Sequence, residues 1–291
     1  MEYVIELDKV TRRYPGFLLD HVSFQVPKGC IMGFVGENGA GKSTTLKAIL
    51  GLISIDEGTV RVFGQKLKDD GRLREDIGVV LDECCFPEQL TVKQTNLFMG
   101  YIFKNWDSAL FAGYVKRLGL AENKTVKEFS RGMKMKLQIA AALAHRPKLL
   151  IMDEATSGLD PIVRDEILEL FQEFIEDEDH TILMSTHITG DLEKIADYIT
   201  CIHKGKLLFS ENKDELLERY GIVHCGQSDY EKLNPEYVKR VRKGEFGYEV
   251  LVNNRENCAP RSGSLVVDRA SIDEIMLLLV KGRRMDGREE E

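Results

Sequence analysis

The sequence lacks long hydrophobic runs, which limits the ways in which the chain could meet a membrane. Its longest apolar stretches, such as residues 275–280, are far shorter than the roughly 18 residues that a transmembrane helix needs. The first residues show no basic segment followed by an apolar stretch, so no secretory signal is visible. From these two absences we expect a cytoplasmic protein that forms no transmembrane path itself.

Paired cysteines and a basic excess are also missing. The six cysteines, which include the adjacent Cys84 and Cys85, show no C-x-x-C spacing, and this argues against a zinc site and a disulfide framework. The net charge is −8, whereas proteins that coat nucleic acids usually carry a basic excess. We therefore expect reduced thiols and no nucleic-acid partner. A chain of 291 residues with 43% hydrophobic residues suits one large domain or two unequal domains.

A glycine-rich run between an expected strand (residues 31–35) and an expected helix (45–50) is the most informative feature present. The run consists of Gly36, Glu37, Asn38, Gly39, Ala40, Gly41, Lys42, Ser43 and Thr44. Its glycines allow successive backbone N–H groups to turn toward the β- and γ-phosphates of a nucleotide, and the following helix adds its positive end. Lys42 would neutralise phosphate charge, and the pattern assigns the Ser43 hydroxyl to Mg²⁺. The run predicts a site for a nucleoside triphosphate.

Hydrophobic periodicity predicts an α/β fold with several parts. Alternating segments predict an N-terminal antiparallel sheet from residues 2–8, 17–26 and 58–64. Short apolar runs predict buried strands of a parallel sheet at residues 31–35, 77–81, 149–152 and 181–185. The pattern from about residue 83 to 146 is helical and predicts an inserted helical subdomain. Beyond residue 221 we expect a small accessory αβ domain, so the predicted domains are residues 1–221 and 222–291.

Two carboxylates, Asp153 and Glu154, follow the expected strand at 149–152. The carboxyl ends of parallel strands open onto the ligand site in α/β folds, so Asp153 would assist Mg²⁺ binding and Glu154 would face the attacking water. Taken alone this pair is a weak signal, because acids are common at strand ends. Beside a phosphate-binding loop it becomes strong.

Three further segments resemble those of ATP-binding-cassette (ABC) ATPases, and their order and spacing match over about residues 2–220. They are residues 129–134 (Phe-Ser-Arg-Gly-Met-Lys), 153–161 (Asp-Glu-Ala-Thr-Ser-Gly-Leu-Asp-Pro) and 185–187 (Ser-Thr-His). The resemblance implies a P-loop NTPase fold of the ABC type, in which a mixed RecA-like core carries an antiparallel β-subdomain and a helical subdomain. It also implies an enzyme that binds ATP and Mg²⁺ and hydrolyses the ATP.

The first of these segments is similar to the ABC signature. Ser130 and Gly132 occupy its serine and second-glycine positions, so the resemblance implies a helix that points at the γ-phosphate held by an opposite protomer. Arg131 and Met133 stand where the family usually has glycine and glutamine. An ordinary surface helix capped by Ser130 is the alternative interpretation of this segment.

The resemblance assigns roles to further residues. It implies that His187 contacts the γ-phosphate, although a histidine at a strand end is otherwise often structural. It implies that Tyr14 stacks on adenine, with an ordinary surface tyrosine as the alternative. The loop that crosses between protomers would consist of Ser157, Gly158, Leu159 and Asp160.

Asp82 departs from the family pattern. After the strand at residues 77–81 the family usually has a glutamine that reaches Mg²⁺ and links to the transport partner, and the aligned residue here is Asp82. An aspartate still offers oxygen to Mg²⁺, but it adds negative charge beside Asp153 and Glu154. We predict Asp82 as a metal ligand, with the start of a solvated loop as the alternative.

The resemblance implies that two cassettes, either two copies of this chain or this chain and a related ABC ATPase, close around two Mg-ATP molecules. It further implies an energy-coupling subunit that works with integral-membrane permease subunits on separate chains and is held at the inner face of the cell membrane. Loop 82–90 is the expected docking region. Residues 101–107 and 129–136 resemble bacterial cassettes that work with export-type permeases, and the alternative is that the aromatic residues there belong to the core of the helical subdomain. A non-transport ABC ATPase that acts on ribosomes or DNA is the second hypothesis. A small-molecule kinase would not explain the segments at Ser130 and His187.

Overall fold

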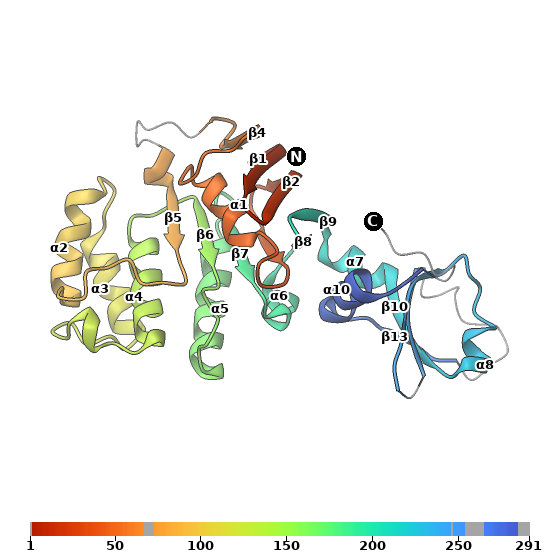
Figure 1. The fold of residues 1–291 in the computed structure, drawn as a ribbon. Helices are drawn as coiled ribbons and strands as arrows, with labels where there is room; N and C mark the ends of the chain where they lie inside the picture. Colours follow the sequence, from red (N-terminus) through yellow and green to blue (C-terminus); the bar gives the residue numbers. More distant parts are fainter. Residues whose placement is uncertain (1, 67–72, 246, 254–264, 285–291) are drawn as a thin grey trace. The chain divides into compact units, whose positions relative to one another are not determined.

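The computed structural model describes residues 2–66, 73–245, 247–253 and 265–284, and these form two compact units (Figure 1). The first, which we call the main unit, ends at Ser210, and the second, the accessory unit, begins at Glu211. Within the described ranges no helix has both the length and the apolar character that crossing a membrane requires.

A six-stranded sheet forms the centre of the main unit. Its strands lie in the order β5 (Ile77–Val80), β6 (Leu149–Asp153), β7 (Thr181–Thr186), β3 (Ile31–Val35), β8 (Tyr198–His203) and β9 (Lys206–Asn212). The pairs β5–β6, β6–β7, β7–β3 and β3–β8 are parallel. The four strands predicted from apolar runs are confirmed, whereas β8 and β9 were not predicted.

The register of this sheet brings three chain segments to one edge. Val35 at the end of β3 pairs with Thr186 at the end of β7, and Asp153 at the end of β6 pairs with Ser185. Because these strands are parallel, the loops that follow them leave the sheet on the same side. The glycine-rich loop, Glu154 and the residues after β7 therefore lie together.

A three-stranded antiparallel sheet, in the order β2–β1–β4, completes this part of the main unit as predicted. Its strands are β1 (Tyr3–Tyr14), β2 (Phe17–Pro27) and β4 (Glu57–Val62). Its buried face packs with helix α1 (Lys42–Ile49) and with strands of the central sheet in one hydrophobic cluster. Ile5, Leu46 and Phe34 represent the three elements in that cluster, and each is at most 1% exposed. The core thus fixes the start of α1 against both sheets.

The helical subdomain is present between β5 and β6 and has its own core. Its helices are α2 (Val92–Ile102), α3 (Ser108–Arg117) and α4 (Arg131–Ala144), and the 3-10 turn η2 (Val126–Glu128) lies just before α4. A second 3-10 turn, η1 (Leu73–Asp76), precedes β5. The three helices lie beside one another near β5 in Figure 1. Their side chains pack around buried Phe111 and Leu137. Side chains of Thr91, Asp107 and Ser130 cap the three N-termini.

Two further helices of the main unit, α5 (Pro161–Ile175) and α6 (Thr189–Ile195), follow β6 and β7.

The accessory unit contains a four-stranded antiparallel sheet in the order β11–β12–β10–β13. The strands are β10 (Tyr220–Cys225), β11 (Val238–Lys243), β12 (Tyr248–Asn253) and β13 (Val267–Arg269), and the helices are α7 (Lys213–Arg219), α8 (Gln227–Tyr230) and α10 (Ile272–Lys281). The two units divide after Ser210, within β9, whereas the sequence-based division is after residue 221. The physical reason is that Tyr220 and Gly221 already pair with β12, through Asn253 and Val252.

Candidate functional site

The glycine-rich loop is closed toward the protein and open toward solvent. Gly41 has φ 113°, and a Cβ there would lie 3.0 Å from Phe17 Cζ. A Cβ at Gly36 would lie 2.3 Å from the backbone oxygen of Ile202, whereas one at Gly39 would meet nothing within 4 Å. The first N–H groups of α1 have no intrahelical acceptor, and together with the helix dipole they attract anions. The loop therefore has the form of a phosphate cradle that opens at Gly39.

Lys42 is the first residue of α1, and its side chain is only 6% exposed. The ammonium group donates a hydrogen bond to Gly36 O at 2.7 Å and lies 3.5 Å from Glu154 Oε1. A buried ammonium needs such partners, because burial of an unpaired charge is costly. Its position folded over the loop is suited to phosphate oxygens, which would offer the same ammonium stronger acceptors.

Glu154 has an unusual backbone conformation. Its φ is 52°, in the left-handed region that residues other than glycine rarely adopt, and its N–H donates to Ser185 O at 3.0 Å. Its side chain is 17% exposed, and Oε2 lies 2.6 Å from Nδ1 of His187. Backbone strain of this kind persists where the surroundings hold it, and it is common at functional sites. The structure thus brings together Lys42, Glu154 and His187, as the sequence predicted.

Asp153 and Ser43 carry the oxygen ligands predicted for Mg²⁺. Asp153 is 8% exposed, and one of its carboxylate oxygens accepts a hydrogen bond from the Ser185 hydroxyl, which orients the other. Ser43 is exposed at the second residue of α1. Within the described residues no cluster of three or more His, Cys, Asp or Glu side chains could hold a metal alone. These hard oxygen donors fit Mg²⁺, which usually takes one or two carboxylates and completes its shell with phosphates and water.

The predicted signature segment begins helix α4. The Ser130 hydroxyl accepts from the N–H of Met133 at 3.3 Å, so Ser130 caps the helix, and both Ser130 and Arg131 are exposed. A Cβ at Gly132 would lie 3.4 Å from Leu159 Cδ2. The structure therefore places the signature segment beside loop 157–160 of the same chain.

Loop 157–160 leads directly into α5. Asp160 accepts from the N–H of Val163 at 3.1 Å and caps that helix, in which Pro161 is the first residue. Leu159 is buried, whereas Gly158 and Asp160 are exposed. Gly158 has φ 70°, a conformation that favours glycine. The two exposed residues of this loop, Gly158 and Asp160, are accessible to a second chain.

Asp82, the predicted departure from the family pattern, pairs with Arg131. Arg131 Nη2 lies 2.5 Å from Asp82 Oδ1, and both side chains are about half exposed. The sequence did not predict this contact. The assignment of Asp82 to Mg²⁺ remains a prediction, and the contact offers its carboxylate a different partner.

The aromatic residues near the loop include one that the sequence did not single out. Tyr14 lies at the end of β1, is 38% exposed, and has the Arg12 guanidinium 5.0 Å from its ring centroid. Phe17, at the start of β2, instead contacts the loop itself at Gly41. The turn Pro15–Gly16 between two strands was the sequence signal that could have placed both aromatics near one hairpin end.

Cys201, on β8, lies near enough to Lys42 and Glu37 to be influenced by both charges. Burial raises the pKa of its thiol to about 12, and the positive charge of Lys42 opposes this only partly. The thiol therefore stays protonated at neutral pH, and a protonated thiol is a poor nucleophile.

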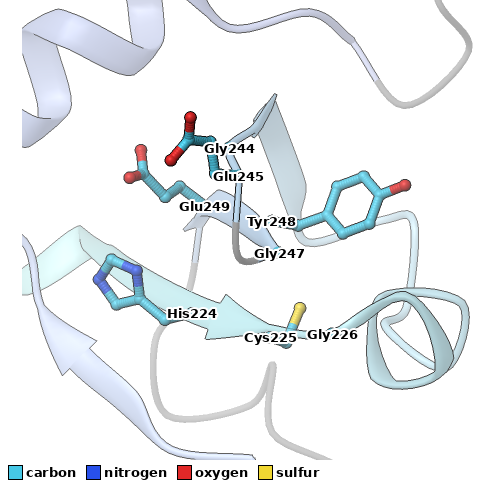
Figure 2. Close-up of a pocket in the computed structure, with 8 residues that line it drawn as sticks. All are labelled: His224, Cys225, Gly226, Gly244, Glu245, Gly247, Tyr248 and Glu249. Carbon is cyan, nitrogen blue, oxygen red and sulfur yellow. The ribbon is translucent and has the colours of Figure 1, made fainter.

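A pocket of about 390 Å³ lies in the accessory unit (Figure 2). Its lining includes the side chains of His224, Tyr248, Glu245 and Glu249. Glu249 already accepts a hydrogen bond from Arg242 Nε at 2.8 Å. The carboxylates of Glu245 and Glu249 would repel the negative charge of a phosphate, so this pocket does not resemble the site at Gly36–Thr44.

Comparisons with known proteins agree with this geometry. The profile of a family described as "ABC transporter" matches residues 19–157. Bacitracin transport ATP-binding protein BcrA of Bacillus licheniformis is 35% identical over 223 residues, which are 75% of this chain and 73% of BcrA. Lantibiotic transport ATP-binding protein SrtF of Streptococcus pyogenes is 36% identical over 206 residues, 68% of this chain and 89% of SrtF. A solved structure described as the ATP binding subunit of an ABC transporter is 27% identical, has a TM-score of 0.67, and matches over 73% of this chain and 91% of its own.

Proposed function

Because this chain belongs to the ABC transporter family of ATP-binding proteins, we propose that it is the ATPase subunit of an exporter whose membrane-spanning subunits are separate chains. The observation that carries the proposal is the position of Glu154 between Lys42 and His187, at the sheet edge where β3, β6 and β7 end. This is the arrangement that hydrolysis of a bound triphosphate requires: cations for the phosphates and a carboxylate for water.

Each residue of this site has a defined task in the proposal. The backbone of the glycine-rich loop and the Lys42 ammonium bind the phosphates and stabilise charge that spreads over the γ-phosphoryl group. Glu154 orients or deprotonates the attacking water, and His187 holds the Glu154 carboxylate in place. When bound, Mg²⁺ would neutralise phosphate charge, and Ser43 and Asp153 would hold it.

The active form in this proposal is a pair of cassettes that face one another. Each nucleotide would lie between the glycine-rich loop of one chain and the α4 N-terminus of the other. The exposure of Ser130 supports this arrangement, because the positive end of α4 is free to approach a phosphate. ATP would close the pair, and hydrolysis would reopen it.

The relatives supply the first cargo molecules to test. BcrA and SrtF are named for transport of bacitracin and of a lantibiotic. Peptide antibiotics are therefore the cargo class that we propose for this exporter. Loop 82–90 beside α4 is the region that we propose for permease docking.

Two measurements on the full-length chain test this function. We expect Mg²⁺-dependent ATP hydrolysis by the wild type and none above background by Lys42→Ala, with Lys47→Ala, an exposed residue of the same helix, as the matched control. We also expect an integral-membrane protein to purify with the tagged chain from its native host. Hydrolysis combined with recovery of ribosomes or DNA in place of a membrane protein would overturn the transport assignment and favour the second hypothesis.

A further inference from the structure

The loop after β5, residues 81–90, is attached along its length to α4 and the turn before it. At one end, Gln138 Nε2 donates to Leu81 O at 3.1 Å, and the Cys85 thiol lies 3.3 Å from Gln138 Oε1. At the other end, two backbone N–H groups of η2 donate to the loop: Lys127 N to Glu88 O at 2.9 Å and Val126 N to Leu90 O at 2.9 Å. These contacts hold the loop against α4 at one end and against η2 at the other.

Two cations of α4 contact this loop: Lys134, whose Nζ lies 3.7 Å from Glu88 Oε1, and Arg131, which pairs with Asp82. The place of Arg131 in the helix is unfavourable by itself. Arg131 is the first residue of α4, whose first turn contains no acidic residue. A cation at a helix N-terminus opposes the helix dipole. Asp82 supplies the missing negative charge from outside the helix, with Nη2 and Oδ1 2.5 Å apart.

The same guanidinium reaches a second loop. A Cβ at Gly158 would lie 2.9 Å from Arg131 Nη1, so a larger residue at position 158 would displace the guanidinium. Arg131 therefore lies between Asp82, which follows β5, and Gly158, which follows β6. Because β5 and β6 are parallel neighbours, both loops leave the sheet at the edge where Glu154 lies.

Stability does not account for this arrangement. Arg131 and Asp82 side chains are 53% and 51% exposed, and ion pairs with that exposure contribute little to folding. The pair instead fixes the position of the Arg131 side chain relative to the loop after β5, because a guanidinium presents its donors in a rigid fork. The cavity at this point, about 400 Å³, is lined by Asp82, Glu83, Cys84, Arg131, Lys134, Met135 and Gln138.

We propose that Arg131 is a positioning residue for ATP hydrolysis and that the Asp82 carboxylate holds Arg131 rather than Mg²⁺. Through this pair the 81–90 loop and the 157–160 loop keep the N-terminus of α4 in the orientation that the closed cassette pair requires. The proposal rests on the proposed function, because hydrolysis is its readout.

A double-mutant cycle tests the proposal. We expect Asp82→Asn and Arg131→Gln each to lower kcat about tenfold or more, and the double variant to be no slower than the slower single variant, because residues that act as a unit are not additive. Asp82→Glu keeps the carboxylate and should retain most of the activity. Glu83→Gln, which removes an exposed carboxylate of the same loop, is the matched control and should leave kcat unchanged.

The dependence of hydrolysis on Mg²⁺ concentration separates the two roles of Asp82. In the proposal, the concentration that gives half-maximal activity is the same in Asp82→Asn as in the wild type. A several-fold increase in Asp82→Asn but not in Arg131→Gln would make Asp82 a metal ligand and overturn the proposal. Additive losses in the double variant would also overturn it.

Thermal melting checks that the variants fold. Should either neutral variant melt early, the reversed pair, Asp82→Lys with Arg131→Glu, carries the same test: recovery of kcat above that of either reversed single variant supports the pairing, and no recovery contradicts it. A wild-type chain without Mg²⁺-dependent hydrolysis would instead remove the proposed function. In that case Glu154→Gln and the wild type would hydrolyse ATP equally slowly. If only the Arg131 proposal fails, the wild type still hydrolyses ATP faster than Glu154→Gln.

Discussion

His187 Nδ1 lies 2.6 Å from Glu154 Oε2, and this contact joins the residue after β7 to the residue after β6. Glu154 is held from two further sides, by its N–H bond to Ser185 O and by the Lys42 ammonium 3.5 Å from Oε1. A carboxylate fixed in this way needs little reorganisation before it accepts a proton from water. The three contacts together explain why the strained backbone of Glu154 is retained.

Replacement of His187 by alanine should therefore impair hydrolysis more than nucleotide binding. General acid–base and positioning effects of this kind contribute about 10²-fold or more, so we expect a loss of that order in kcat. Binding of a fluorescent ATP analogue should change little, because Lys42 and the glycine-rich loop are intact. His224→Ala, an exposed histidine of the accessory unit, is the control. Equal kcat in wild type and His187→Ala would exclude a role for this contact in turnover.

Gly36→Ala should damage the phosphate loop through a backbone collision. The new Cβ would lie 2.3 Å from Ile202 O, an atom that moves only if β8 moves. Overpacking of this kind costs about 1–3 kcal/mol in unfolding free energy, and the displaced loop should also bind ATP more weakly. Urea denaturation and nucleotide titration measure the two effects.

Gly190→Ala is the matched control for this change. Gly190 is in helix α6, and a Cβ there would meet nothing within 4 Å. Alanine is the better helix residue, so the free energy of unfolding should stay equal or rise by about 0.5–1 kcal/mol. If both alanine variants behaved alike, the close approach of Gly36 to β8 would have no energetic importance.

His145 should make the main unit sensitive to acid. It is 1% exposed, stacks on Phe103 with ring centroids 4.1 Å apart, and its ring nitrogens lie 3.3 Å from Ile77 O and 3.4 Å from Ala141 O. Burial lowers the pKa of the imidazole, and the two carbonyl contacts offset this only in part.

The direction of the pH effect follows from that lowered pKa. Below about pH 6.5, the ordinary pKa of histidine, the unfolded chain takes up a proton that the folded chain resists. The stabilisation is therefore complete above this pH and is lost as the pH falls toward the folded-state pKa. Urea midpoints at pH 7.5 and 5.5 should differ less in His145→Gln than in the wild type, and an identical difference would show that another group is responsible.

The sequence predicted those parts of the site that local patterns encode. Apolar runs placed β3, β6 and β7, and parallel pairing then required that the glycine-rich loop, Glu154 and His187 meet at one sheet edge. Strand β8 was not predicted, because Thr200 interrupts the apolar residues of Tyr198–His203 and leaves no continuous apolar run.

Contacts between distant segments account for the other omissions. The Arg131–Asp82 pair joins residues 49 positions apart and depends on how the helical subdomain packs beside β5. The contact of Phe17 with Gly41 likewise arises only when the antiparallel sheet covers α1. The start of the accessory unit became visible only through the pairing of β10 with β12. Periodicity and motif spacing contain no information on such contacts.

The central claim is that Glu154 activates water for hydrolysis of ATP held by this chain. The most direct test measures steady-state ATP hydrolysis and light scattering of Glu154→Gln, with Glu169→Gln, an exposed residue of α5, as control. We predict that Glu154→Gln loses at least about 10²-fold in turnover, still binds ATP, and doubles in mass when Mg-ATP is added, because the closed pair cannot reopen. Turnover by Glu154→Gln equal to that of the wild type would contradict the account.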